Sequence, residues 1–173
     1  MKGGGGMVFR GRVWLTGDNI NTDLILPIQA YYLPIEEQAS WVFSANRPGW
    51  AAQVRQGDIL VAGRNFGMGS SRPAARSLKN LGLACLVADS INGLFYRNAV
   101  NFAFPALEAP GVAGMFQEGE VAEVSFEDFS VSRAAGRAGL PTLPMPPQLL
   151  RILKAGGIYP LLEGLGKIAP VDG

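Results

Sequence analysis

One stretch constrains the fold of this chain more than any other: an apolar run, a glycine turn and a helical pattern in direct succession. The run spans residues 58–63 and the helical pattern spans 73–82. The turn between them reads Gly67-Met68-Gly69-Ser70-Ser71-Arg72. A strand, a glycine turn and a helix start in this order direct free backbone N–H groups toward one point. The pattern predicts an α/β layer.

The side chains of this turn suit a small anion, most plausibly a carboxylate. Two hydroxyls supply donors, acceptors or a base, and Arg72 offers a planar fork that matches a carboxylate. On this pattern alone, an ordinary helix start with an arginine in solvent stays an equal alternative. Arg72 stands where a dinucleotide fingerprint needs glycine, and no Gly-Lys-Ser/Thr follows for a Walker loop. A nucleotide-binding module is therefore disfavoured.

Two absences in the composition limit the chemistry. The 173 residues include no histidine and one cysteine, which excludes a Ser-His pair, an internal disulfide and a complete iron–sulfur or zinc site in this chain. Cys85 lies in an apolar run and is expected to be a buried, inert side chain. With one cysteine and no signal peptide, we expect a cytoplasmic protein. A net charge of +1 and no membrane-length apolar stretch argue against nucleic-acid and membrane partners.

The remaining pattern predicts one domain, at 8–165, between a flexible leader at 1–7 and a loose tail at 166–173. The polar residues 16–23 are expected to form a turn, and 28–33 an aromatic loop. Strands are expected at 8–15, 24–26, 83–88, 101–107, 120–126 and 129–132, and helices at 34–46, 93–100 and 148–155. The alternation of strands and helices favours an α/β fold with some parallel pairing.

Three segments occur in the order and spacing of a known family. They are Gly-Asp-Asn-Ile-Asn-Thr-Asp at 17–23, the segment 57–72 with its Gly-x-Gly-Ser-Ser-Arg, and Phe-Tyr-Arg-Asn-Ala-Val-Asn at 95–101. With these motifs, residues 8–165 resemble the small subunit of 3-isopropylmalate dehydratase, the swivel domain of the aconitase superfamily. The resemblance implies an α/β fold, a three-layer β/β/α swivelling domain of the aconitase C-terminal type. It also implies the small subunit of an iron–sulfur hydro-lyase of leucine biosynthesis.

The resemblance further implies a division of labour between two chains. A large subunit would hold the 4Fe–4S cluster, and this chain would bind no metal or cofactor and would close over the cluster as a lid. The active enzyme would be a heterodimer or heterotetramer acting on a small hydroxy-diacid.

The resemblance assigns roles to individual residues. Ser70 matches the catalytic base, which works as an alkoxide, and Asp23 matches an acid that pairs with a histidine of the other domain in aconitases. Ser71 and Arg72 match ligands of the substrate carboxylate. The loop after Pro27 sets substrate choice in the family, which places Tyr31, Tyr32 and Leu33 near the substrate tail. No arginine lies between residues 23 and 46, so a third carboxylate would be unpaired there. An aliphatic tail is expected: isopropyl, methyl or dimethyl.

One departure from the family leaves the substrate open. The family continues Ser-Ser-Arg-Glu-His-Ala, whereas this chain has Pro73-Ala74-Ala75 after Arg72. A related dehydratase of methyl- or dimethylmalate therefore stays an alternative to isopropylmalate. A non-catalytic carboxylate-binding partner domain is a further alternative, but such a domain has no need of Ser70, Ser71, Arg72 and Asp23 together.

Overall fold

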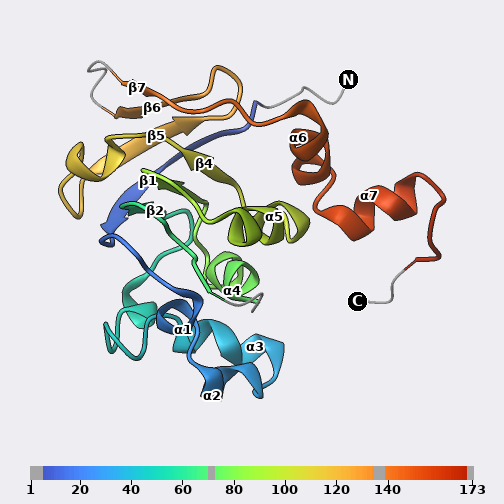
Figure 1. The fold of residues 1–173 in the computed structure, drawn as a ribbon, viewed down its shortest axis with the longest axis horizontal. Helices are drawn as coiled ribbons and strands as arrows, with labels where there is room; N and C mark the ends of the chain where they lie inside the picture. The colour runs from blue at the N-terminus through green and yellow to red at the C-terminus, as the bar shows by residue number, and fades with distance from the viewer. Residues whose placement is uncertain (1–5, 70–72, 135–138, 171–173) are drawn as a thin grey trace.

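The computed structural model describes residues 6–69, 73–134 and 139–170, and within these its strands form a single mixed sheet (Figure 1). The order of the strands is β4-β3-β2-β1-β5-β6-β7. Their bounds are β1 Val8–Leu15, β2 Ile59–Ala62, β3 Cys85–Ala88, β4 Ala106–Glu108, β5 Val121–Ser125, β6 Ser130–Arg133 and β7 Leu140–Pro141. The first four strands pair in parallel, and β1, β5, β6 and β7 pair antiparallel.

Strand β1 joins the two halves of the sheet because it changes partner along its length. Its first part, from Val8 to Arg12, pairs with β5, and its last part, from Val13 to Leu15, pairs with β2. Gly11 lies just before this change, and a Cβ there would stand 2.0 Å from the carbonyl oxygen of Gly57. Only glycine allows the backbone of the 57–58 turn to approach β1 so closely.

The sheet curls so that its two halves form two layers, with helices as the third. Alternate residues of the parallel strands face opposite ways: Leu60 and Leu86 pack with the helices, whereas Ile59 and Cys85 pack with the antiparallel half. Figure 1 shows α4 and α5 on one side of the parallel strands and β5–β7 on the other. The β/β/α layering expected from the resemblance is confirmed, and both faces of the central parallel strands β2 and β3 are buried, as such strands require.

The helices are short. Their bounds are α1 Thr22–Ile25, α2 Ile28–Tyr31, α3 Ile35–Gln38, α4 Ala74–Asn80, α5 Gly93–Asn101, α6 Pro147–Lys154 and α7 Ile158–Gly164, with 3₁₀ turns at Ala39–Trp41, Ala51–Gln53 and Val112–Gly114. None of the helices in the described part of the chain is long and apolar enough to cross a membrane.

Most predicted elements are confirmed, but the strand expected at 101–107 is shorter and the region 22–46 differs. The strand is confined to Ala106–Glu108 because α5 continues to Asn101, and the aromatic loop expected at 28–33 begins as the helix α2. The expected edge strand at 24–26 is wrong, because Asn21 caps a helical turn there and accepts a hydrogen bond from the Leu24 N–H at 2.9 Å. The expected helix at 34–46 is also wrong in length. It ends as α3 at Gln38, passes into a 3₁₀ turn, and reaches Phe43 in the left-handed conformation at φ 56°. Burial of Phe43 in the core outweighs its helical propensity.

Candidate functional site

Three loops meet at the carboxyl ends of the parallel strands. They follow β1, β2 and β3, and their backbones continue the parallel pairing of the strands. The Asn19 N–H donates to the carbonyl of Arg64 at 2.8 Å, the Gly67 N–H to Ile20 at 2.7 Å, and the Phe66 N–H to Ser90 at 3.1 Å. This edge is where ligands bind in open α/β sheets. The motif at 17–23 and the first part of the glycine turn, far apart in sequence, therefore lie side by side.

Both glycines of the turn are required by their surroundings. Gly67 has φ 80°, and a Cβ there would stand 2.3 Å from Cγ of Phe95 in α5. Gly69 has φ 112°, and its Cβ would stand 3.0 Å from Oγ1 of Thr22. Glycine tolerates both the positive φ and the close approach. The turn is thus packed between α1 and α5.

The turn continues into Ser70, Ser71 and Arg72, which lie outside the described residues. The structure resumes at Pro73, the residue before the first residue of α4, so the helix predicted from 73 begins one position later. The catalytic role of Ser70 and the carboxylate-binding roles of Ser71 and Arg72 stay predictions.

Asp23 lies in the first turn of α1, next to the glycine turn. Its neighbour Thr22 donates its N–H to the carbonyl of Met68 at 2.9 Å and is buried against Gly69. Asp23 itself is exposed and, with Pro27, Ile28 and Gln29, lines an open hollow of about 270 Å³. The structure brings Asp23 to the same edge as Met68 and Gly69, the residues that precede the predicted Ser-Ser-Arg segment in the sequence.

The three predicted tail-contacting residues differ in exposure. Tyr32 is 79% exposed and Tyr31 is 49% exposed, and their rings meet edge to face at 5.5 Å. Leu33 is partly buried against the core. The tyrosines therefore present apolar surface that the other described residues leave exposed, while Leu33 anchors their loop.

Two pairs at this edge were not predicted as site residues. Asp18 accepts the backbone N–H of Arg64 at 2.7 Å and the Arg64 guanidinium at 3.0 Å, and these bonds, the backbone one first, lower the pKa of Asp18. Asn19 and Asn65, both with positive φ, share an amide hydrogen bond of 3.2 Å. The presence of Asp, Asn and Arg in the two motifs was the only sign of these pairs in the sequence. A sequence does not show which side chains face each other.

Metal ligands are sparse among the described residues. These residues contain no group of three or more acidic or cysteine side chains placed to hold a metal ion. Cys85 is fully buried in β3, and burial strongly raises the pKa of its thiol. A thiolate ligand needs the opposite environment, so the described residues do not fit an iron–sulfur cluster.

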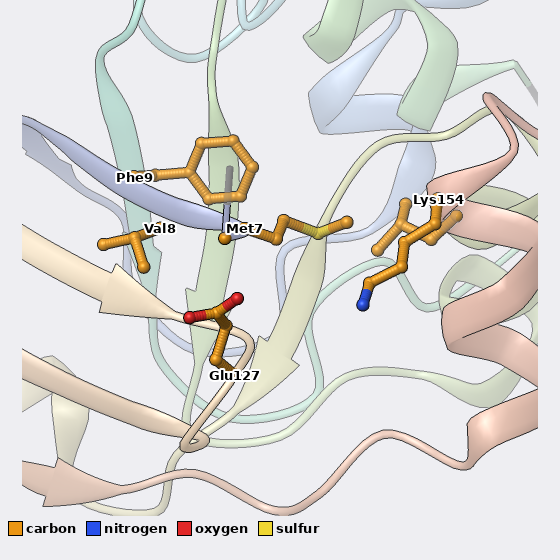
Figure 2. Close-up of a pocket in the computed structure, with 7 residues that line it drawn as sticks. Met7, Val8, Phe9, Glu127 and Lys154 are labelled. Carbon is orange, nitrogen blue, oxygen red and sulfur yellow. The ribbon is translucent and has the colours of Figure 1, made fainter. Parts of the chain in front are cut away.

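Two larger hollows lie at the other end of β1. One, of about 530 Å³, is lined by residues from the start of β1, by Glu127 after β5, and by Lys154 at the end of α6 (Figure 2). A second, of about 550 Å³, shares Met7, Phe9 and Leu153 with it. Neither contains a residue of the motifs at 17–23 or 67–72, so size alone does not identify the functional site.

Comparisons with known proteins agree with the position of the motifs. The sequence profile of the aconitase C-terminal domain matches residues 17–110. The chain is 41% identical over 163 residues to the 3-isopropylmalate dehydratase small subunit 1 of Methanopyrus kandleri, covering 92% of this chain and 95% of the relative. It is 38% identical to the isopropylmalate/citramalate isomerase small subunit of Methanocaldococcus jannaschii, covering 90% and 94%.

A solved structure shows the same fold. The crystal structure of 3-isopropylmalate dehydratase (LeuD) from Methanocaldococcus jannaschii matches with a TM-score of 0.86 at 27% identity, covering 92% of this chain and 95% of that one. The profile match spans more than half of the sequence and the relatives match over nearly their whole length. The resemblance drawn from the motifs is thereby confirmed, and this protein belongs to the aconitase C-terminal domain family.

Proposed function

We propose that this chain is the small subunit of an iron–sulfur hydro-lyase that interconverts 2-isopropylmalate and 3-isopropylmalate in leucine biosynthesis. One observation carries the proposal. The loops 17–23 and 63–69 meet at the carboxyl edge of the parallel strands, which brings Asp23 to the turn that leads into Ser70. The names of the full-length relatives support the same activity.

In the proposed reaction, Ser70 removes the proton next to a substrate carboxylate, and Ser71 and Arg72 bind that substrate's carboxylate. A serine hydroxyl is a weak acid, so its alkoxide needs hydrogen-bond donors and positive charge nearby. Arg72 would supply part of that charge. Asp23 is proposed to pair with a residue of the large subunit, in keeping with its exposed position at the edge.

The partner is proposed to be a large subunit that holds the 4Fe–4S cluster, in a heterodimer or heterotetramer. Three facts about this chain support it: it has no histidine, it has only one cysteine, and that cysteine is buried. When bound, the cluster supplies a Lewis acid for the leaving hydroxyl. The lack of a cysteine pair also supports the cytoplasm as the compartment.

The surface beside the site supports this partnership. Large apolar side chains of the segment 28–41 are exposed together, and they are Ile28, Tyr31, Tyr32, Ile35 and Trp41. Exposed apolar side chains gathered in one segment are typical of a surface that binds a partner or ligand. We propose that this segment faces both the substrate tail and the large subunit.

The proposal is tested by co-expressing the two subunits without oxygen and following formation of the unsaturated diacid. The substrates are 3-isopropylmalate, dimethylmalate, citramalate and homocitrate. Turnover of isopropylmalate is expected, with homocitrate about a hundredfold slower in kcat/KM, because its third carboxylate would be buried without a cation. Homocitrate turnover at a comparable rate would contradict the proposed tail pocket.

A dehydratase of a smaller malate is the second candidate. The Methanocaldococcus relative, whose name includes citramalate, favours it, as does Pro73-Ala74-Ala75 in place of the family's polar residues. Turnover of citramalate or dimethylmalate without isopropylmalate would support this candidate. An intact complex that turns over none of the four would support a non-catalytic domain.

A further inference from the structure

The loop that carries Tyr31, Tyr32 and Leu33, here called the tail loop, is held by one buried amide. Gln38, the last residue of α3, is only 4% exposed. Its Nε2 donates to the carbonyl of Leu33 at 3.0 Å and, more weakly, to the carbonyl of Tyr31 at 3.4 Å. The two carbonyls flank Tyr32, so a single side chain fixes the backbone on both sides of the most exposed tyrosine.

The same amide connects the tail loop to the helix that follows the glycine turn. Nη2 of Arg76, in α4, donates to Oε1 of Gln38 at 3.4 Å. Arg76 is half-buried, and its guanidinium carbon lies 5.5 Å from the centre of the Phe102 ring. Both N–H groups of the Gln38 amide and its oxygen therefore have partners, which also fixes which way the amide points.

These contacts make Gln38 a link between two parts of the site. The tail loop would contact the alkyl end of the substrate, and the turn before α4 would bind its carboxylate. A small displacement of one relative to the other changes how well a substrate of given length fits. A buried glutamine among apolar neighbours is otherwise unfavourable, because its polar atoms need partners.

We propose that Gln38 is a positioning residue that sets the selectivity of the enzyme for the length of the substrate tail. This inference rests on the proposed function. Gln38 does not touch substrate; it holds the Tyr31 and Leu33 carbonyls in place and ties them to Arg76. Its loss should weaken contacts to a long tail and leave a short tail nearly unaffected.

The test compares Gln38→Met in the assembled complex with the wild type on isopropylmalate and on citramalate. Methionine keeps the volume and removes every hydrogen bond of the amide. The KM for isopropylmalate should rise about tenfold with kcat within about twofold, and the values for citramalate should change less than about twofold. Gln148→Met, the same change at an exposed position of α6, is the matched control. It should leave the KM and kcat for both substrates unchanged.

Gln38→Glu is the second variant, and it tests the proposal if Gln38→Met does not accumulate as folded protein. The carboxylate keeps the size and the Arg76 contact but loses the two donors. The same fall in the ratio of kcat/KM for isopropylmalate to kcat/KM for citramalate supports the proposal. An equal loss on both substrates in the folded variants, or an unchanged ratio, overturns it and assigns Gln38 to folding alone. A wild-type complex inactive on both substrates would instead overturn the proposed function, and the selectivity role with it.

Discussion

Single residues at the site are fixed by contacts that bring distant parts of the chain together. Gly67 is the plainest example, because its φ of 80° and the Phe95 ring, 2.3 Å from where a Cβ would stand, make any other residue strained at this position. The sequence predicted a glycine turn at this position from the strand before it and the helix after it. It did not predict the reason, because Phe95 lies in α5, and nothing in the local pattern shows that this ring packs on the turn.

Gly67→Ala should lower the free energy of unfolding by about 3 kcal/mol, from backbone strain and overpacking against Phe95. Urea unfolding followed by circular dichroism measures the loss. The control is Gly164→Ala at the end of α7, where a Cβ meets no atom within 4 Å and φ is not positive. The control should be neutral or slightly stabilising. Equal effects of the two changes would show that the contact with Phe95 does not constrain the turn.

Elements of this fold are joined by polar side chains as well as by the core. Asp58 precedes β2 and is only 4% exposed. It accepts the Arg12 guanidinium at 2.6 Å, the indole N–H of Trp14 at 2.7 Å and the Arg55 N–H at 2.9 Å. Burial alone would raise the pKa of Asp58, but these hydrogen bonds outweigh it and lower the pKa. One carboxylate thus ties β1 to the segment before β2.

Asp58→Asn should lower the free energy of unfolding at pH 7 by about 3 kcal/mol, since Arg12 and two N–H donors lose a charged partner. A carboxyl with a lowered pKa stabilises the fold above its ordinary value and loses that effect as pH falls through its folded-state value. The difference between the two proteins should therefore shrink below about pH 4, measured by urea unfolding across pH. Asp128→Asn, at the exposed turn after β5, should have a much smaller effect; a pH-independent difference for Asp58→Asn would contradict the account.

Elements were predictable from sequence where hydrophobic periodicity was long or strongly apolar. The expected strand at 8–15 is β1, residue for residue, and the runs around Ile59 and Cys85 are buried strands. Segment 24–26 was misjudged because three residues are too few for a period to distinguish strand from helix, and the helix expected at 34–46 was misjudged in its length. The local structure of these segments depends on the Asn21 cap and on burial of Phe43, and both depend in part on tertiary contacts.

At the scale of the whole molecule, one sheet serves two purposes. Its parallel half presents the loops that carry the motifs, and its antiparallel half packs across the back of that half. Motif spacing predicted which loops carry the candidate site, and the structure brings the motif at 17–23 to the first part of the glycine turn. The links that hold the tail loop, Gln38 and Arg76, were not predictable, because a buried glutamine in a short helix has no pattern of its own.

The chain as a whole is half of the proposed enzyme, and a titration tests this claim directly. The large subunit is titrated with this chain, and the initial rate of 3-isopropylmalate dehydration is followed without oxygen. The rate should rise from near zero to a plateau at equal subunit concentrations. Ser70→Ala should bind the large subunit as tightly as the wild type but give a plateau about a thousandfold lower, since the proposed base is lost.

Ser130→Ala, in β6 of the antiparallel half, is the matched control and should reach the wild-type plateau. Saturable activation by the wild type, with binding but no activation by Ser70→Ala, is the result that the account predicts. A large subunit that is equally active alone, or a Ser70→Ala plateau close to that of the wild type, would contradict it.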